Sequence, residues 1–429
     1  MCVLALAAIL VPGMGPVSAR ANGFQIRPGD PDWSANAFAG MAAKAYDAST
    51  AWTNPAGMTQ LDQNEVDLGA AGLLTSINFS GSNMLGPFAT PGSDGGNAGG
   101  PALVPSLAAV WVVNQKLRLG FSVETPFGER TVYPTDFVGR YQALVSSISD
   151  VEIGLAAAYK ITPTFSIGGG PIIDHFAARL TTAVNTGATA ALTGDPEVDD
   201  AGDDWSLGYH LGVFWRPVAD WRFGIDYRSR IRNAIEGNQT VSIPPLITAL
   251  SPATAAELGG LATPMRTTIT LPDIMTISAV WQIDPEWAAL ATLQWADWSV
   301  IQSLVLSGLN GSSSTLPLYF HNSWMGSLGV NYTPAALPKL MLQAGIGLDQ
   351  SPVTDQDRTP RLPSLDEAIL GFGLHYAITP AVMLKASFLH EFGIGPNSID
   401  FSSGSTAGTL LGTYSTGVSV FGLGVGVKF

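Results

Sequence analysis

FGLGVGVKF, residues 421–429, is the stretch of sequence that decides the fold of this chain. The positions between its large residues hold three glycines and Lys428. A strand that is apolar on one face and small on the other is typical of a membrane barrel, with lipid outside and a crowded lumen inside. The apolar face takes every second position: Phe421, Leu423, Val425, Val427 and Phe429.

A second segment, residues 287–295, indicates membrane depth as well as face. Trp287 and Trp295 stand at the two ends of one face, with Ala289, Ala291 and Leu293 between them. Eight residue steps of ~3.4 Å, tilted by ~45°, cover about 19 Å of depth. This is close to the ~25 Å apolar band between aromatic girdles that outer-membrane barrels present to lipid.

A third segment, residues 221–232, alternates between aromatic and charged side chains. One face carries Trp221, Phe223, Ile225 and Tyr227. The other face carries Arg222, Gly224, Asp226, Arg228, Arg230 and Arg232. In a barrel, the charged face is expected to line the lumen. We expect these arginines to pair with wall carboxylates, such as Asp226 or Glu236, and with a plug, rather than to form a track for anions.

Short turns and long connections alternate along the chain. Short turns are expected at 114–115, 162–163, 217–220, 284–285, 333–338 and 379–380. Long connections are expected at 81–101, 126–147, 181–203, 242–265, 308–316, 349–365 and 395–410. Seven long and six short connections join fourteen strands, which puts both termini on the periplasmic side. The sequence therefore predicts an all-β protein, in which residues 63–429 form a fourteen-stranded antiparallel barrel of the bacterial outer membrane.

Composition excludes several other classes of protein. Hydrophobic residues make up 46% of the chain, which argues against disorder. No stretch after residue 21 approaches the ~20 apolar residues of a membrane-spanning helix. The formal net charge of −14 argues against nucleic acid as a partner, because binding to phosphates needs a basic face.

The first 21 residues are typical of a secretory signal peptide. An apolar run over 3–11 precedes the small-residue cleavage motif Ala19-Arg20-Ala21. No Lys or Arg precedes that run, which leaves open a start upstream of Met1. The single cysteine, Cys2, lies in this segment, so disulfides and cysteine-ligated metals are excluded from the mature chain. We expect no cofactor and no metal site.

Residues 22–62 do not alternate and are rich in small side chains, as in 34–37 and 39–43. Small residues suit close packing in a confined space, and a fourteen-stranded barrel is wide enough to conduct water unless its lumen is filled. We therefore expect a plug of short helices inside the lumen. A periplasmic tail or a small separate domain is the alternative.

Several motifs resemble those of the FadL/TodX family of outer-membrane transporters for long-chain fatty acids and other hydrophobic compounds. The start Gly23-Phe24-Gln25 and the run 47–58, with its Asn54-Pro55-Ala56, are similar to the family's start and hatch. Further matches follow in the family's order and spacing: 125–128, 138–144, 271–273, 297–299, 349–353 and 361–363. The resemblance covers essentially the whole mature chain.

The resemblance implies a monomeric barrel with an N-terminal hatch and passive, ATP-independent uptake. It also implies a sideways exit into the membrane through an inward kink in the third strand, here at Thr125, Pro126 and Gly128. Because Pro cannot donate a ladder hydrogen bond, a break in pairing at this point is physically reasonable. The alternative is that Pro126 merely ends the strand. Asn54, Pro55 and Ala56 are expected to anchor the hatch, with a part in gating.

The resemblance also suggests where a ligand binds. Phe24 and Phe127 are the apolar candidates, and Arg179, His175 and His321 lie where the family places basic residues. Because His is mostly neutral at neutral pH, two histidines in these places favour a less acidic ligand, such as an alkane or an aromatic hydrocarbon. The alternative is that they are ordinary loop or lumen histidines.

The connection 242–265 is unusually apolar for an extracellular loop and contains a helix-prone stretch, 253–261. Exposed apolar surface often marks a binding site, so we expect this loop to form an entrance groove.

The expected partners are a hydrophobic small molecule, outer-membrane lipid and the barrel-assembly machinery, which would read the terminal Phe429. A general diffusion porin, an outer-membrane hydrolase and an adhesin are the alternatives. No catalytic or metal-binding motif supports an enzyme.

Overall fold

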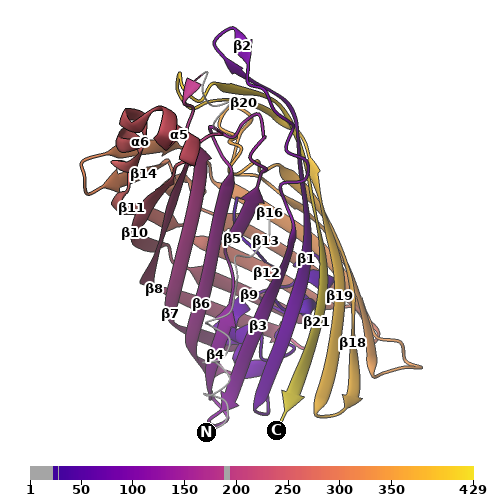
Figure 1. Cartoon of the computed structure of the whole chain (residues 1–429). Coiled ribbons are helices and arrows are strands. Elements are labelled where there is room, and N and C mark those ends of the chain that lie inside the picture. The colour runs from indigo at the N-terminus through magenta and orange to yellow at the C-terminus, as the bar shows by residue number, and fades with distance from the viewer. Residues whose placement is uncertain (1–22, 28, 188–193) are drawn as a thin grey trace.

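The computed structural model describes residues 23–27, 29–187 and 194–429, which form a closed antiparallel β-barrel (Figure 1). Closure comes from β1, Glu65–Leu85, which pairs with β3, Pro101–Val112, on one side and β21, Thr409–Lys428, on the other. Glu65 stands opposite Lys428, so the start and the end of the barrel lie at the same rim. The predicted signal peptide, 1–21, lies outside the described residues.

Nine barrel strands are continuous and five are interrupted, which confirms the predicted fourteen. The other continuous strands are β6 (Val145–Thr162), β7 (Phe165–Ala183), β8 (Glu197–Val218), β17 (Leu340–Asp349), β18 (Asp366–Thr379) and β19 (Val382–Ile394). The interrupted strands are β4 with β5 (Leu117–Glu124, Gly128–Val132), β9 with β10 (Trp221–Arg228, Ile231–Ser242), β11 with β12 (Thr263–Leu271, Ile274–Gln282), β13 with β14 (Trp287–Ala296, Ser303–Gly308) and β15 with β16 (Ser313–Pro317, Ser323–Tyr332). Two short strands, β2 (Phe88–Ala89) and β20 (Ser398–Ser402), extend β1 and β21 beyond the rim.

All six predicted short turns are present, but one predicted long connection is wrong. β14 and β15 continue into the expected loop 308–316 and leave only residues 309–312 between them. Gly311 has a φ of 87°, and the side chain of Asn310 accepts a hydrogen bond of 3.0 Å from the Ser312 amide. An Asn-Gly pair is the strongest signal for a tight hairpin. The strict alternation of short and long connections therefore fails at this hairpin.

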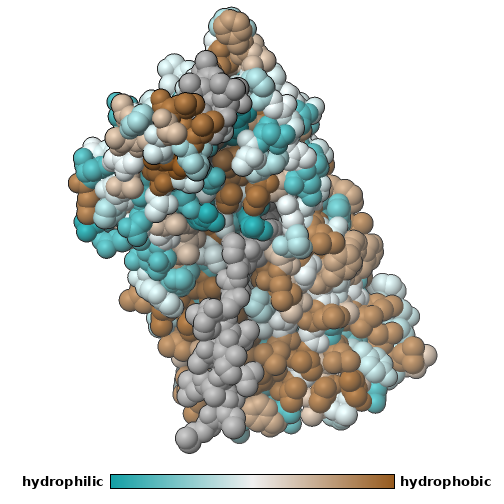
Figure 2. Space-filling view, viewed as in Figure 1, coloured by the Kyte–Doolittle hydropathy of each residue, from teal (hydrophilic) through white to brown (hydrophobic). Residues whose placement is uncertain are grey.

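The outward face of the barrel carries an apolar belt. Figure 2 shows hydrophobic residues gathered over the lower part of the barrel and hydrophilic residues at the end that carries the long loops. Trp287 stacks on Tyr332 at 4.3 Å, and Trp221 stacks on Trp281 at 5.5 Å, near the short turns. These rings form part of a girdle at the lower edge of the belt. No helix in the described part of the chain has the length and apolarity to cross a bilayer.

The arginine face predicted over 222–232 is only partly correct. Arg222 and Arg228 point inward, where they donate to the backbone oxygens of Lys44 and Trp52. Between β9 and β10 the alternation changes phase, so that Arg230 and Arg232 are exposed on the outward side. A slip of one residue moves every following side chain to the other face.

Residues 23–27 and 29–62, which we call the inner segment, lie inside the barrel. They contain α2 (Pro31–Ala35), α3 (Thr50–Thr53) and the 3-10 helix η1 (Pro55–Gln60), and nearly all of their described side chains are buried. Their hydrogen-bond partners lie on β4, β7, β8, β9, β12, β13, β16, β17 and β19. Because these partners surround so much of the circumference, the segment lies in the lumen, enclosed by the barrel, and not below the barrel.

Wall glycines let the inner segment approach the strands closely. A Cβ added at Gly345 would lie 2.0 Å from the carbonyl oxygen of Asn36, and one at Gly371 would lie 2.3 Å from that of Ser34. Such distances are far shorter than any real contact of a Cβ atom. The small inward face of the strands therefore serves to admit backbone, not only side chains.

A buried ionic cluster ties the inner segment to the wall. The ammonium group of Lys385 lies 2.9 Å from Asp30, 2.6 Å from Asp47 and 2.7 Å from Asp67. Since an unpaired charge in such a place is very costly, this cluster holds the two parts of the protein in one arrangement. Arg27 makes a similar buried pair with Asp349.

Two helices cap the end of the barrel that bears the long loops (Figure 1). They are α5, Pro245–Leu250, and α6, Pro252–Gly259, so the helix predicted over 253–261 is present. Ile247 and Leu258 are buried, whereas Leu246 and Leu250 are exposed.

Candidate functional site

An aromatic cluster fills the lumen where the inner segment begins. Phe24 packs edge-on against Trp298 at 4.8 Å and lies 5.8 Å from Phe127 and 6.4 Å from Phe320. Trp298 stands in the 3-10 helix η3, Trp298–Val300, which interrupts the strand formed by β13 and β14. These four rings come from four distant parts of the chain, and each is 3% exposed or less.

Further apolar side chains, from the wall strands and their connections, extend this cluster, and we call the whole the apolar chamber. It includes Ile172, Phe176, Ile231, Ile235, Ile269, Leu271, Ile274, Ile301, Leu318, Val353 and Leu362. A cavity of about 60 Å³ opens beside Phe176, Ile235 and Ile269. Its other lining residues are mostly apolar as well, so this part of the lumen offers a ligand van der Waals contact and few polar partners.

The third strand breaks beside the chamber. Leu107 pairs with Val123 below the break, and the Val132 amide donates to the Ala98 carbonyl, at 2.8 Å, above it. Both pairs fit one antiparallel register, because Ala98 precedes Leu107 by nine residues and Val132 follows Val123 by nine residues. Between them no described pairing joins residues 101–106 of β3 to β5. The ladder is therefore interrupted and then resumes without a gained or lost residue.

The inner segment pairs with the strand across this break. The Gly128 amide donates to the Phe24 carbonyl at 2.8 Å, and the Ile26 amide donates to the Pro126 carbonyl at 2.6 Å. Backbone groups freed from the β3–β5 ladder thus find partners in the lumen. The structure brings together Phe24, Phe127 and residues 125–128, where the third strand pairs with the inner segment instead of β3. The inward kink predicted there remains a prediction.

The predicted basic residues lie elsewhere. His175 and Arg179 stand on the outward face of β7, where His175 lies against Trp205 and Arg179 pairs with Asp199 at 2.7 Å. His321 is exposed in the connection between β15 and β16. None of the three lines the chamber.

Sequence reasoning missed Arg361 as a lumen cation. It donates 3.2 Å hydrogen bonds to the backbone oxygens of Val145 and Thr181, among other partners. Burial lowers the pKa of Arg361 to about 10, so the guanidinium stays charged at neutral pH. Arg361 begins the motif 361–363, which resembles a motif of the FadL/TodX family. That motif is the sequence signal that could have identified it.

Asn54 makes the contacts expected of an anchor. Its amide nitrogen donates to the Ala42 carbonyl at 2.7 Å and to the wall carbonyl of Val213 at 3.0 Å. Its oxygen accepts the Ala56 amide at 3.1 Å, which caps η1, and Pro55 begins that helix. Asn54 thus joins two parts of the inner segment to β8.

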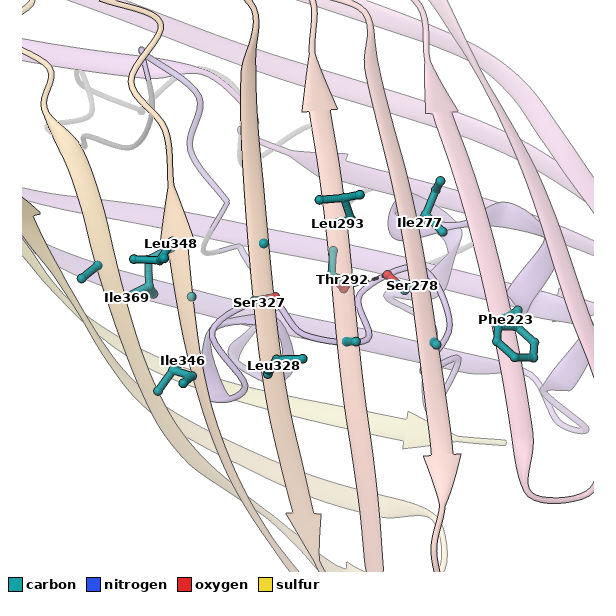
Figure 3. A pocket seen from close by; sticks show the side chains of 15 residues that line it. Phe223, Ile277, Ser278, Thr292, Leu293, Ser327, Leu328, Ile346, Leu348 and Ile369 are labelled. Atoms are coloured by element: carbon teal, nitrogen blue, oxygen red, sulfur yellow. Dashed lines mark hydrogen bonds between the residues drawn. The ribbon is translucent and has the colours of Figure 1, made fainter.

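A separate apolar hollow of about 880 Å³ lies on the wall and does not belong to the chamber (Figure 3). Leu293, Leu328 and Ile346, which line it, are roughly half exposed and therefore face outward. Small residues between these large ones, such as Gly326, leave the space that forms the hollow. Its place on the lipid-facing side excludes it as part of a path through the lumen.

Comparison with known proteins gives a family match over nearly the whole chain. The profile described as "Outer membrane protein transport protein (OMPP1/FadL/TodX)" matches residues 14–429. The "Long-chain fatty acid transport protein" of Escherichia coli O6:H1 is 25% identical over 399 residues, which cover 86% of each chain. The "47 kDa outer membrane protein" of Pasteurella multocida is 26% identical over 385 residues, covering 87% of this chain and 88% of its own.

Solved structures share the fold. A Pseudomonas aeruginosa FadL homologue superposes with a TM-score of 0.86 at 22% identity, covering 95% of this chain and 100% of that one. The Pseudomonas putida toluene transporter TodX gives 0.65 at 17% identity, covering 89% and 94%.

Proposed function

The chain belongs to the OMPP1/FadL/TodX family of outer membrane transport proteins, and we propose that it carries hydrophobic small molecules passively through the apolar chamber to a sideways exit. Membership makes it an outer-membrane transporter for fatty acids or other hydrophobic compounds, not an enzyme. The passive mechanism, the exit and the ligand contacts are our proposal.

One observation carries the proposal: the apolar chamber adjoins the interrupted ladder between β3 and β5. Phe127 belongs to both, since it packs on Phe24 and lies within the break. On the β3 side, Leu103 is 64% exposed and faces lipid. A ligand on Phe24 and Phe127 would need to pass only this wall to reach the membrane.

A sideways exit avoids the unfavourable transfer of the ligand to water. Apolar surface costs about 25 cal/mol per Å² to expose, so a long alkyl chain or an aromatic hydrocarbon would leave an aqueous pore very slowly. Release into lipid keeps that surface covered throughout. No energy source is needed, because the ligand moves towards a phase in which it dissolves.

The inner segment acts in this proposal as a hatch. Its hydrogen bonds to nine wall strands support this role, and a segment held in this way would oppose the direct passage that a general diffusion porin needs. Asn54, Pro55 and Ala56 would keep the hatch against β8 and take part in gating. The ligand is a long-chain fatty acid or a hydrocarbon, and the lining of the chamber suits the apolar part of either.

Uptake by cells tests the proposal. Cells that lack their own transporter and express this chain should accumulate a radiolabelled long-chain fatty acid or alkane faster than vector controls. Phe24→Ala with Phe127→Ala should lower the rate. Phe388→Ala with Phe421→Ala, a matched pair of contacting rings on the outward face, should not. A wild-type rate no higher than that of the vector for both ligand classes would contradict the proposal.

A further inference from the structure

Three buried carboxylates meet in the wall beside the chamber. Asp150 and Glu152 alternate on the inward face of β6, and the β6–β7 register sets Asp174 opposite Glu152. One oxygen of each lies within 4.8 Å of those of the other two. Asp150 and Asp174 are fully buried, and Glu152 is 2% exposed. Three like charges so close together in an apolar surrounding require compensation.

The neighbouring side chains supply only part of that compensation. Arg228 pairs with Glu152 and also donates to the Trp52 carbonyl at 3.0 Å. Neither carboxylate oxygen of Asp150 or of Asp174 meets a donor at hydrogen-bonding geometry among the described residues. Among the described residues, Arg228 therefore pairs with one of the three acids, and neither Asp150 nor Asp174 has an ion-pair partner of its own.

A fourth side chain, independent of the acids, is directed at the same place. Asn233 on β10 is fully buried, yet neither its amide nitrogen nor its oxygen makes a hydrogen bond of acceptable geometry. Its side chain lies beside Asp174. A buried amide without such a bond is costly, and its oxygen is a ligand that hard cations accept.

We propose that Asp150, Glu152, Asp174 and Asn233 bind one calcium ion. Oxygen atoms on opposite sides of Ca²⁺, each at 2.3–2.6 Å, are about 5 Å apart, and the carboxylate oxygens, which all lie within 4.8 Å of one another, are close enough to share one ion. Mg²⁺ is smaller, demands near-ideal octahedral geometry and gives up its water reluctantly, so this set of side chains suits it less well. The ion balances the carboxylates of Asp150 and Asp174 and gives the amide oxygen of Asn233 a partner.

The ion would also fix the floor of the chamber. Asp150 and Asp174 adjoin Ile148 and Phe176 on the same inward faces, and both of these apolar residues line the chamber. The ion would be held by side chains on β6, β7 and β10. It would therefore link β7 to β10, which are separated by β8. A protein without the ion should therefore be less stable, whether or not a transport ligand is present.

Calcium content and unfolding test the site without reference to transport. The protein is refolded from denaturant in detergent with either CaCl₂ or EDTA, so that burial does not block access to the site. After desalting, elemental analysis should find one Ca²⁺ per wild-type chain, and CaCl₂ should raise the unfolding temperature. Asp150→Asn and Asp174→Asn should lose both effects. Asp203→Asn, an exposed acid on the outward face of β8, is the matched control and should keep them.

Asn233→Asp provides a test that does not depend on removing a ligand. It adds a carboxylate to the set and should bind Ca²⁺ more tightly than wild type in isothermal titration. Heat-modified mobility on gels confirms that each variant is folded. If the folded wild type binds no stoichiometric Ca²⁺, two acids share protons instead and the proposal is overturned. Equal binding by wild type and Asp174→Asn would also overturn it.

Discussion

The Phe24 carbonyl accepts a 2.8 Å hydrogen bond from the Gly128 amide, so the inner segment takes the place of β3 as the partner of the third strand. This exchange gives the Gly128 amide and the Pro126 carbonyl backbone partners where the ladder to β3 is interrupted. It also explains why the aromatic ring of Phe24 meets that of Phe127 at the break. The start of the described chain and the interrupted ladder between β3 and β5 are therefore in direct contact.

Gly345→Val should displace the inner segment, because the new side chain would collide with the Asn36 backbone. We expect larger single-channel conductance in planar bilayers and faster cleavage by trypsin after Lys44, which is buried in the wild type. Gly326→Val is the matched control on the adjacent strand, since a Cβ at Gly326 meets nothing within 4 Å. Similar conductance of the two variants would argue against close packing of the inner segment.

Lys385→Met should destabilise the protein by about 3–5 kcal/mol, because it leaves three buried carboxylates without their cation. The measurement is the free energy of unfolding from urea titrations in detergent. Lys339→Met, at an exposed lysine in a turn, should change it by less than about 0.5 kcal/mol. A small loss at Lys385 would mean that the carboxylates are neutral in the folded protein.

Acid should loosen the inner segment. Burial by itself would raise the pKa of Asp32, but Lys44, His375 and Lys385 outweigh it and hold this pKa well below its usual value. A lowered folded pKa stabilises the protein above the unfolded value of about 3.9, and that stabilisation is lost as pH falls below it. The fluorescence of the stacked pair Trp33 and Trp52 should report the change below about pH 4.

Asp32→Asn supplies the control for this pH dependence. The amide cannot lose a proton, so the variant should be less stable at neutral pH and should lose less stability on acidification. An unchanged acid transition in the variant would assign the effect to other carboxylates.

Deletion of residues 244–262, which contain α5 and α6, should reduce uptake of a hydrophobic ligand while leaving a heat-resistant barrel. The exposed Leu246 and Leu250 give this cap an apolar surface that a ligand can meet first. Uptake assays and gel mobility measure the two effects separately. Undiminished uptake would remove the loop from the ligand's path.

The barrel could be predicted from sequence because alternation fixes the face of each side chain, and lipid selects large apolar residues on one face. Phe421, Leu423 and Val427 are exposed as that rule requires. The rule fails where a strand is interrupted: nothing in the sequence near Arg230 marks the change of phase after β9. It also fails above the membrane, where lipid no longer selects residues, and there His175 and Arg179 face outward.

The candidate site was only partly predictable. Phe24 and Phe127 were available from the family resemblance, whereas Trp298 and Phe320 join them through strand pairing that the sequence does not specify. The carboxylate cluster was missed for the same reason. Asp150 and Asp174 lie on neighbouring strands, so register rather than a local motif brings them together.

A disulfide across the break tests the central claim most directly. The shared register would set Ala102 opposite Gly128 if the β3–β5 ladder were closed. The mature chain offers no competing cysteine, because Cys2 lies in the predicted signal peptide. A Cβ at Gly128 meets only the movable tip of the Ile26 side chain within 3 Å, so the position tolerates the change.

The measurement is uptake of a radiolabelled hydrophobic ligand by cells carrying Ala102→Cys with Gly128→Cys, compared with each single variant. With the bridge formed under oxidising conditions, uptake should fall to the vector level, and it should recover on reduction. Uptake by the bridged protein at the rate of its reduced form would contradict a sideways exit between β3 and β5.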